Sequence, residues 1–118
     1  MKVAFITNYT ELYGANRSLL SLIDGLSQYK VSAHVVAPGE GDMTKALQDR
    51  GVPVTTMPIQ IWMSERPSSC EPLRWILWMR NAIRRFYRNL RVLPALVQQL
   101  RKWKIDVIHT NSSVIPIG

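Results

Sequence analysis

The sequence predicts an α/β protein in which a parallel sheet of about four strands is flanked by helices. Its 118 residues alternate between short apolar segments of strand composition and longer segments of helical period, which is the pattern of strand–helix–strand units. The first strand, residues 3–7, is apolar at consecutive positions, as expected of a strand buried on both faces. Right-handed crossovers then give the order 3-2-1-4 of a Rossmann-like sheet.

The first helix is predicted after residues 8–14, which read as a loop. Its apolar residues recur at helical spacing and form one stripe; they are Leu19, Leu20, Ile23 and Leu26. The second strand, residues 31–37, follows, and a short second helix comes after it. Asp42 is the expected N-cap of that helix, Arg50 its expected end and Gly51 its C′ residue.

The third strand is predicted to pair over a short length, and the fourth to lie at an edge of the sheet. Residues 52–57 contain Pro53 and precede Pro58, so we expect short pairing near the margin of the sheet. The fourth strand, residues 105–110, is apolar and leaves a free edge, which natural sheets normally cover or pair. Residues 1–118 are therefore predicted to form a single, partial domain, and we expect a homodimer or a further segment to cover this edge.

A long helical region from Leu73 lies between these two strands. Pro94 is expected to break it, because proline lacks the N–H group of a helix interior, and residues 95–103 then form a separate helix. The first part of this region carries six arginines with no acidic residue between them: Arg74, Arg80, Arg84, Arg85, Arg88 and Arg91. The net charge is +7, and the other 9 basic and 8 acidic residues leave only +1. The basic character therefore belongs to this one element.

On a helical wheel, residues 73–91 separate into an apolar and a basic arc. The apolar arc contains Trp75, Ile76, Met79, Ala82, Ile83, Phe86, Tyr87 and Leu90. The six arginines, with Asn81 and Asn89, lie opposite, and Leu77 and Trp78 interrupt them. A tryptophan beside several guanidinium groups suits an anionic bilayer, where basic side chains meet lipid headgroups and tryptophan settles at the interface.

Two other interpretations of this helix remain open. It is equally compatible with a core helix whose arginines are solvated, with Leu77 and Trp78 covered by the neighbouring loop at Trp62. Clustered arginines could also neutralise nucleic-acid phosphates, but no recognised reading motif accompanies them, so this interpretation ranks last.

Composition and cysteine content exclude several classes of protein. Hydrophobic residues make up 47% and charged residues 19%, which is a globular and not a disordered composition. Cys70 is the only cysteine, so no internal disulfide framework or cysteine-based zinc cluster can form, which fits a reducing cytosol. No segment approaches the ~20 apolar residues that span a bilayer. The sequence favours a cytoplasmic protein, either free or at the inner face of the membrane.

Open α/β sheets bind ligands at the carboxyl ends of their strands, near the switch between strands 1 and 4. Residues 8–17 and residues 109–113 are expected to meet there. Gly14 opens a helix, so its backbone could approach a phosphate, and Arg17 could add positive charge. On this loop alone, the favoured interpretation is that Gly14 merely turns the chain and that Arg17 is a solvated side chain. A single glycine is not the dinucleotide-binding fingerprint, and no acidic residue closes strand 2, so dinucleotide binding is disfavoured.

Several phrases, in this order along the chain, resemble family 4 retaining glycosyltransferases, which have the GT-B fold. Residues 2–8 with 13–19 are similar to the opening strand, glycine turn and helix of that family. Residues 35–41 resemble its second strand, residues 51–54 its third, and residues 106–112 its fourth strand and loop. The resemblance implies transfer of a sugar from a nucleotide-diphosphate sugar with retention of configuration, and no metal or other cofactor.

The resemblance also implies a set of binding residues: Gly14, Ala15, Asn16, Arg17, Asn111 and Ser112. Asn111 stands where the family has a pocket-facing histidine, and an amide can hydrogen-bond a sugar hydroxyl but cannot titrate. His109 matches the first, more structural histidine, and we expect it in the core. No catalytic residue can be named, because the donor-gripping second domain of the family has no counterpart here.

The function expected from these residues is that of the N-terminal, acceptor-side domain of a glycosyltransferase, inactive alone. Its substrates would be a nucleotide sugar and a lipid- or glycan-linked acceptor. The alternative is a non-catalytic α/β module that holds a membrane or a partner through residues 73–91.

Overall fold

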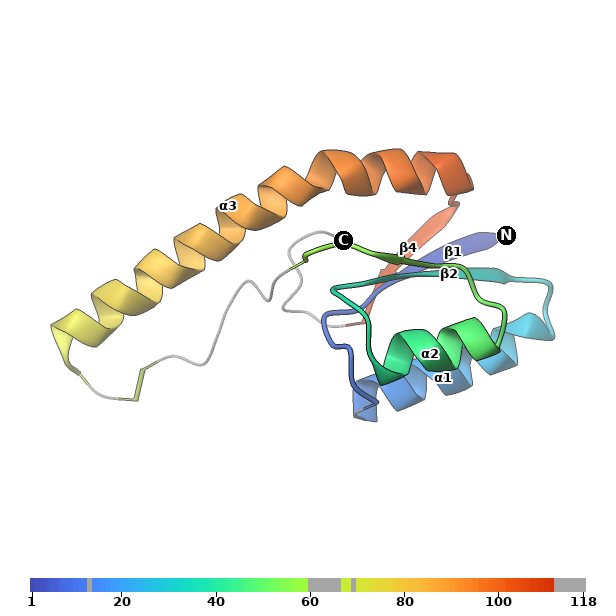
Figure 1. The fold of residues 1–118 in the computed structure, drawn as a ribbon, viewed down its shortest axis with the longest axis horizontal. Coiled ribbons are helices and arrows are strands. Elements are labelled where there is room, and N and C mark those ends of the chain that lie inside the picture. The colour runs from blue at the N-terminus through green and yellow to red at the C-terminus, as the bar shows by residue number, and fades with distance from the viewer. Residues whose placement is uncertain (13, 60–66, 69, 112–118) are drawn as a thin grey trace.

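The computed structural model describes residues 1–12, 14–59, 67–68 and 70–111. Their elements, in chain order, are β1 (Lys2–Ile6), α1 (Gly14–Ser27), β2 (Ser32–Ala37), α2 (Asp42–Asp49), β3 (Val54–Thr56), α3 (Pro72–Trp103) and β4 (Val107–Thr110). The four strands form one parallel sheet in the order β3-β2-β1-β4 (Figure 1). The predicted fold class and strand order are confirmed.

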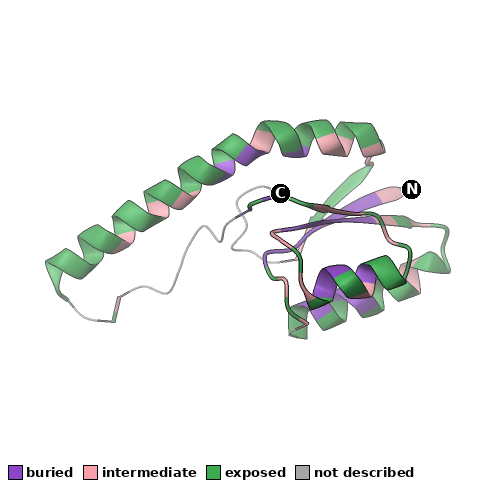
Figure 2. Ribbon diagram, viewed as in Figure 1, coloured by how far each residue is buried: buried purple, intermediate pink, exposed green. Residues whose placement is uncertain are grey.

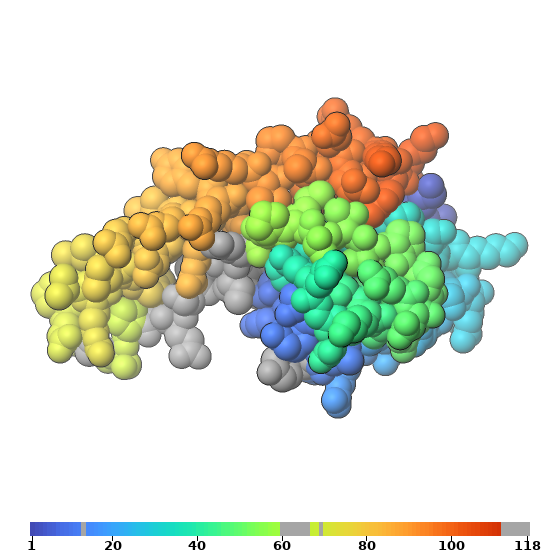
Figure 3. Space-filling model, in the orientation of Figure 1, coloured from blue at the N-terminus to red at the C-terminus, as the bar shows by residue number. Residues whose placement is uncertain are grey.

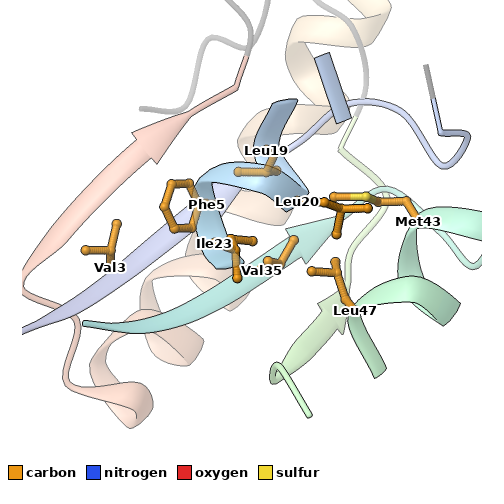
Figure 4. Close-up of a cluster of buried hydrophobic side chains, with 8 residues drawn as sticks. All are labelled: Val3, Phe5, Leu19, Leu20, Ile23, Val35, Met43 and Leu47. Atoms are coloured by element: carbon orange, nitrogen blue, oxygen red, sulfur yellow. The ribbon is translucent and has the colours of Figure 1, made fainter. Parts of the chain in front are cut away.

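The core consists of two apolar clusters, one on each face of this sheet. The first lies between the sheet and helices α1 and α2 (Figure 4) and contains Val3, Phe5, Leu19, Leu20, Ile23, Val35, Met43 and Leu47. The second lies between the sheet and α3 and contains Ile6, Val36, Met57, Ile59, Val92 and Leu96. Because neighbouring residues of a strand point to opposite faces, consecutive residues of β1 serve both clusters. This explains its uninterrupted apolar sequence.

The ends of α2 confirm one expected cap and correct another. Asp42 is the first helical residue and Gly41 is the N-cap. The Gly41 N–H donates to Thr44 Oγ1 at 2.9 Å, so a threonine inside the first turn does the capping that the sequence assigned to Asp42. Gly51 has the positive φ of 69° expected at C′. β3 is confined to Val54–Thr56 at the margin of the sheet, between the two flanking prolines, as predicted.

The predicted break at Pro94 is wrong, because α3 continues through this residue as one helix of 32 residues. Proline removes one helical N–H donor, which leaves the carbonyl of Leu90 without its partner. Both residues lie on the exposed side of α3, where water can take the place of that partner. The axis of α3 changes direction between its two halves (Figure 1), which is how a helix accommodates an internal proline.

The burial of α3 differs sharply between its halves (Figure 2). Its buried residues are Asn89, Val92 and Leu96, all in the second half or at its start. The apolar arc predicted from the helical wheel is largely exposed, so a core helix is the wrong interpretation for residues 73–88. Asn89, which the wheel placed with the arginines, lies on the packed side instead. The loop at Trp62 falls outside the described residues.

β4 is an edge strand, as predicted. Val107 is 44% and Ile108 46% exposed, although their neighbours on β1 are buried. Ile108 lines an open groove of about 480 Å³ with Val97 and Leu100 of α3. His109 is exposed and contacts Phe5 edge-on, with ring centroids 5.4 Å apart. The prediction of a core histidine is therefore wrong, because no described element covers this strand on its outer side.

His34 of β2 packs against the C-terminal end of α3. Its ring lies 4.8 Å from that of Trp103, and its side chain is buried. Burial lowers the pKa of His34 below its ordinary value of 6.5, and the charge of Lys2 lowers this pKa further. Within the described residues, Nδ1 of His34 has no hydrogen-bond partner. The folded chain therefore favours the neutral imidazole.

We expect this histidine to make the protein less stable in mild acid. The unfolded chain takes up a proton near pH 6.5, whereas the folded chain does so only at lower pH. The contribution of neutral His34 to the free energy of unfolding is therefore fully present above pH 6.5 and is lost as the pH falls towards the lowered pKa. Chemical unfolding at about pH 7.5 and about pH 5.5 measures the difference. His34→Leu should reduce this difference; equal pH dependence in wild type and His34→Leu would contradict the assignment.

None of the helices among the described residues combines the length and the apolar character needed to cross a membrane.

Candidate functional site

The candidate site lies where the carboxyl ends of β1 and β4 meet the first turn of α1. The backbone N–H of Asn111 donates to the Ile6 carbonyl at 2.8 Å, which continues the β1–β4 ladder past the end of β4. The side-chain Nδ2 of Asn111 lies 3.3 Å from the Ala15 carbonyl and 3.4 Å from Asn16 Oδ1. The two segments that the sequence predicted to meet are therefore in contact.

Asn16 organises the loop between β1 and α1. Its side chain is 1% exposed, and its Oδ1 accepts a hydrogen bond from the Thr7 hydroxyl at 2.8 Å. Its Nδ2 donates to the carbonyl oxygens of Tyr9 and Glu11 at 3.1 and 2.6 Å. This one amide closes a loop that has few other internal bonds. The buried Asn16 side chain therefore holds the loop that forms the site. Direct contact of this side chain with a ligand stays a prediction.

The other residues predicted for the site differ in their surroundings. Gly14 and Ala15 are exposed, and a Cβ atom added at Gly14 would have no neighbour within 4 Å. The packing of the chain itself therefore leaves room at this turn. Arg17 is exposed, and its Nε donates to the Leu12 carbonyl at 3.0 Å, which anchors the guanidinium beside the loop. Ser112 lies outside the described residues.

The sequence interpretation missed Asn8, the second residue after β1. Asn8 is only 8% exposed, and its Nδ2 has no hydrogen-bond partner within the part of the chain that the structure describes. A buried donor without an acceptor costs about 1–3 kcal/mol, so such groups are rare and need an explanation. The available signal was a polar amide placed directly after a strand that is buried on both faces.

The chemistry of this site is that of binding. Asn8 and Asn111 both carry amides, which donate and accept hydrogen bonds but do not titrate at physiological pH. The exposed first turn of α1 presents backbone N–H groups where the helix dipole favours an anion. Hydroxyl groups and phosphate oxygens are therefore suitable ligands, whereas the amides themselves cannot transfer protons.

A second loop supports this site from the side of β2. Gly41 packs against the β1–α1 loop, and the N–H of Met43 donates to the Thr10 carbonyl at 2.9 Å. A Cβ atom at Gly41 would lie 2.8 Å from both the Cβ and the carbonyl oxygen of Thr10. A Cβ atom at Gly39 would meet only the Thr10 methyl group, at 3.7 Å.

We expect Gly41→Ala to destabilise the protein by about 1–3 kcal/mol, because the new methyl group overlaps backbone that cannot move freely. Gly39→Ala is the matched control and should change the free energy of unfolding by less than about 0.5 kcal/mol. Urea denaturation of both variants measures the difference. Equal stabilities of the two variants would show that the loops do not touch in this way.

The fold defines the chain as an open parallel α/β protein, and the candidate site lies at the topological switch point of its sheet. Comparison with protein families specifies the class further. The profile of Glycosyltransferase Family 4 matches residues 13–117, and the chain belongs to this family. It corresponds to the N-terminal domain of such enzymes. Comparisons with curated proteins and with solved structures gave no match.

Proposed function

We propose that this chain is the acceptor-side domain of a retaining GT-B glycosyltransferase that uses a nucleotide-diphosphate sugar. Its membership in Glycosyltransferase Family 4 supports sugar transfer. The observation that carries the proposal is the contact between Asn111 and the first turn of α1, together with the buried, unpartnered amide of Asn8 two residues after β1. The acceptor proposed is a sugar linked to a lipid or a glycan, at the inner face of a membrane.

Each element of the site has a distinct role in this proposal. The exposed turn at Gly14 and Ala15 lets the donor pyrophosphate approach the backbone, and Arg17 adds a positive charge beside it. Asn111 and Asn8 hydrogen-bond sugar hydroxyl groups. The family's second domain grips the rest of the donor, so we do not expect these 118 residues to transfer sugar by themselves.

The test is a titration of the isotope-labelled chain with UDP-glucose, GDP-mannose and maltose, followed by amide NMR. Millimolar ligand is expected to shift the amides of Gly14, Ala15 and Asn111, while those of α2 stay in place. Shifts with the two nucleotide sugars but not with maltose would locate the pyrophosphate here. The absence of shifts with all three ligands would refute a sugar or nucleotide site.

The buried amide of Asn8 gives a sharper version of this test. We expect Asn8→Leu to weaken the binding measured by NMR about fivefold, because one hydrogen bond of about 1 kcal/mol is lost. The same variant should unfold at an unchanged or higher denaturant concentration, because an unpartnered donor has been removed. Asn81→Leu, at an exposed position of α3, is the control. Tighter or unchanged binding by Asn8→Leu would exclude a ligand contact.

A second candidate function is a non-catalytic module that holds a membrane or a partner through residues 73–91. The exposure of so many apolar side chains on α3 favours this alternative. Binding to membranes without any response to nucleotide sugars would support it over the first proposal.

A further inference from the structure

The first half of α3 has three distinct faces. One stripe, at spacings of three and four residues, contains Trp78, Ala82, Arg85 and Asn89, each half-buried or buried. It continues into Val92 and Leu96, which pack on the sheet, so this stripe is the side that faces the α/β body. Trp78, which one interpretation of the sequence left exposed and the other covered, is half-buried, and its ring lies 5.8 Å from that of Trp75.

A second face is apolar and exposed: it is the apolar arc of the helical wheel without the half-buried Ala82, and it keeps that name from here on. Its seven residues are each between 38% and 64% exposed: Trp75, Ile76, Met79, Ile83, Phe86, Tyr87 and Leu90. The first half of α3 extends past the sheet and past helices α1 and α2 (Figure 3). Soluble proteins rarely expose apolar patches of this extent without a binding function. Three of the seven side chains are aromatic, which is typical of residues placed at a membrane interface.

The third face, beside the apolar arc, is basic. Arg80, Arg84, Arg88 and Arg91 share it, and the whole of α3 contains no acidic residue. Arg74 lies 3.6 Å from Glu71, which precedes the helix. An apolar face with aromatic residues next to a basic face without acidic residues is the composition of helices that lie in the interface of anionic membranes.

We infer that the apolar arc inserts into the surface of an anionic phospholipid bilayer, with the basic face meeting the headgroups. The positive charge of α3 favours a bilayer over a second copy of the chain as the partner of the apolar arc. Two copies joined through their apolar arcs would bring two basic faces together with no acidic residue from either helix to compensate. Anionic headgroups supply the missing negative charge, at about 1 kcal/mol per arginine, or about fivefold in affinity.

The first half of α3 and the candidate site are placed relative to each other by the direction of the strands. α3 runs antiparallel to the strands, so its first half extends beyond the edge of the sheet where the strands end (Figure 1). The candidate site lies at that same edge, with Asn111 and the first turn of α1. The helix segment proposed to meet the bilayer and the candidate site are therefore at the same edge of the sheet. Resting on the proposed function, this shared edge favours a lipid-linked acceptor over a free glycan.

The experiment is flotation of the full chain with mixed phosphatidylglycerol–phosphatidylcholine vesicles and with pure phosphatidylcholine vesicles. Wild type is expected to float with the anionic vesicles and to release them in high salt. Ile83→Asp should weaken this binding by at least about tenfold, because it places a charge in the apolar arc. Arg84→Gln with Arg88→Gln should weaken it about 25-fold.

Matched controls carry the same changes on the other face of the sheet. Leu22→Asp alters an apolar residue of α1 that is 44% exposed, and Lys30→Gln with Lys45→Gln removes the same charge as the arginine pair. These controls should bind anionic vesicles within about twofold of wild type. Circular dichroism verifies the fold of each variant, and a Trp75→Phe variant should lose part of the blue shift of tryptophan emission on binding.

Three results would overturn the inference. One is equal binding of wild type to both kinds of vesicle, or to neither. Another is undiminished binding by folded Ile83→Asp. The third is a wild-type dimer that Ile83→Asp converts to a monomer without vesicle binding, which would assign the apolar arc to a second copy. The nucleotide-sugar titration is done without lipid, so failure of the inference is separable from failure of the proposed function.

Discussion

Asn16→Leu is expected to destabilise the protein by about 3–4 kcal/mol, since four hydrogen bonds of about 1 kcal/mol each are lost together. The Thr7 hydroxyl and the carbonyl oxygens of Tyr9 and Glu11 bond to this side chain, and the amide of Asn111 donates to its Oδ1. Replacement by an apolar side chain of similar size leaves these groups without partners inside the loop. Equilibrium unfolding in urea measures the loss, and NMR should show the amides of residues 8–12 broadened or displaced.

Two further variants test the cause of this loss. Asn16→Asp keeps the acceptor for Thr7 but turns a carboxylate towards two carbonyl oxygens, so it should be at least as destabilising as Asn16→Leu. Asn81→Leu changes an exposed amide of α3 and should alter stability by less than about 0.5 kcal/mol. Wild-type stability of Asn16→Leu would mean that the loop does not depend on this amide.

Ile6→Ala should destabilise the protein by about 2–5 kcal/mol, the usual range for a fully buried large-to-small change. Ile6 is fully buried between the sheet and α3, where it packs with Val36 and Leu96. The removed side-chain atoms leave a cavity that neighbours on two elements line, so little relaxation can fill it. Thermal and urea unfolding should both detect the change.

The matched substitution is Ile83→Ala, on the apolar arc. Ile83 is 53% exposed, so the free energy of unfolding should change by less than about 1 kcal/mol. The same variant should weaken binding to anionic vesicles. A large loss of stability in Ile83→Ala would mean that this side of α3 is packed in the folded chain, and the membrane inference would fail with it.

The sheet could be predicted because its determinants are local and strong. The uninterrupted apolar sequence of β1 identifies a strand covered on both faces, and handedness fixes the order of the others. Pro94 was misleading because the cost of a proline depends on what surrounds the carbonyl left without a partner. Here that carbonyl belongs to Leu90, on the exposed side, and one helix spans both segments.

The site was only partly predictable. The contact between Asn111 and the first turn of α1 follows from parallel strands ending at one edge, and the structure confirms it. The roles of Asn8 and Asn16 depend on the path of a loop, which is set by hydrogen bonds and not by period or composition. The faces of α3 show the same limit, since a helical wheel separates apolar from basic residues but cannot say which side the body covers. Asn89 was misplaced for this reason, and Trp78, whose burial the sequence left open, is half-buried.

The uneven burial of α3 has a consequence for its local stability. Its second half is held by packing on Ile6 and Val36, whereas its first half buries few side chains against the described body. Segments with little tertiary support open at a lower free energy than the core. Backbone amides of residues 73–88 should therefore exchange with deuterium much sooner than those of residues 92–103. A lipid surface would slow deuterium exchange in residues 73–88 alone. Protection along α3 would therefore become even only when the protein is bound to a membrane.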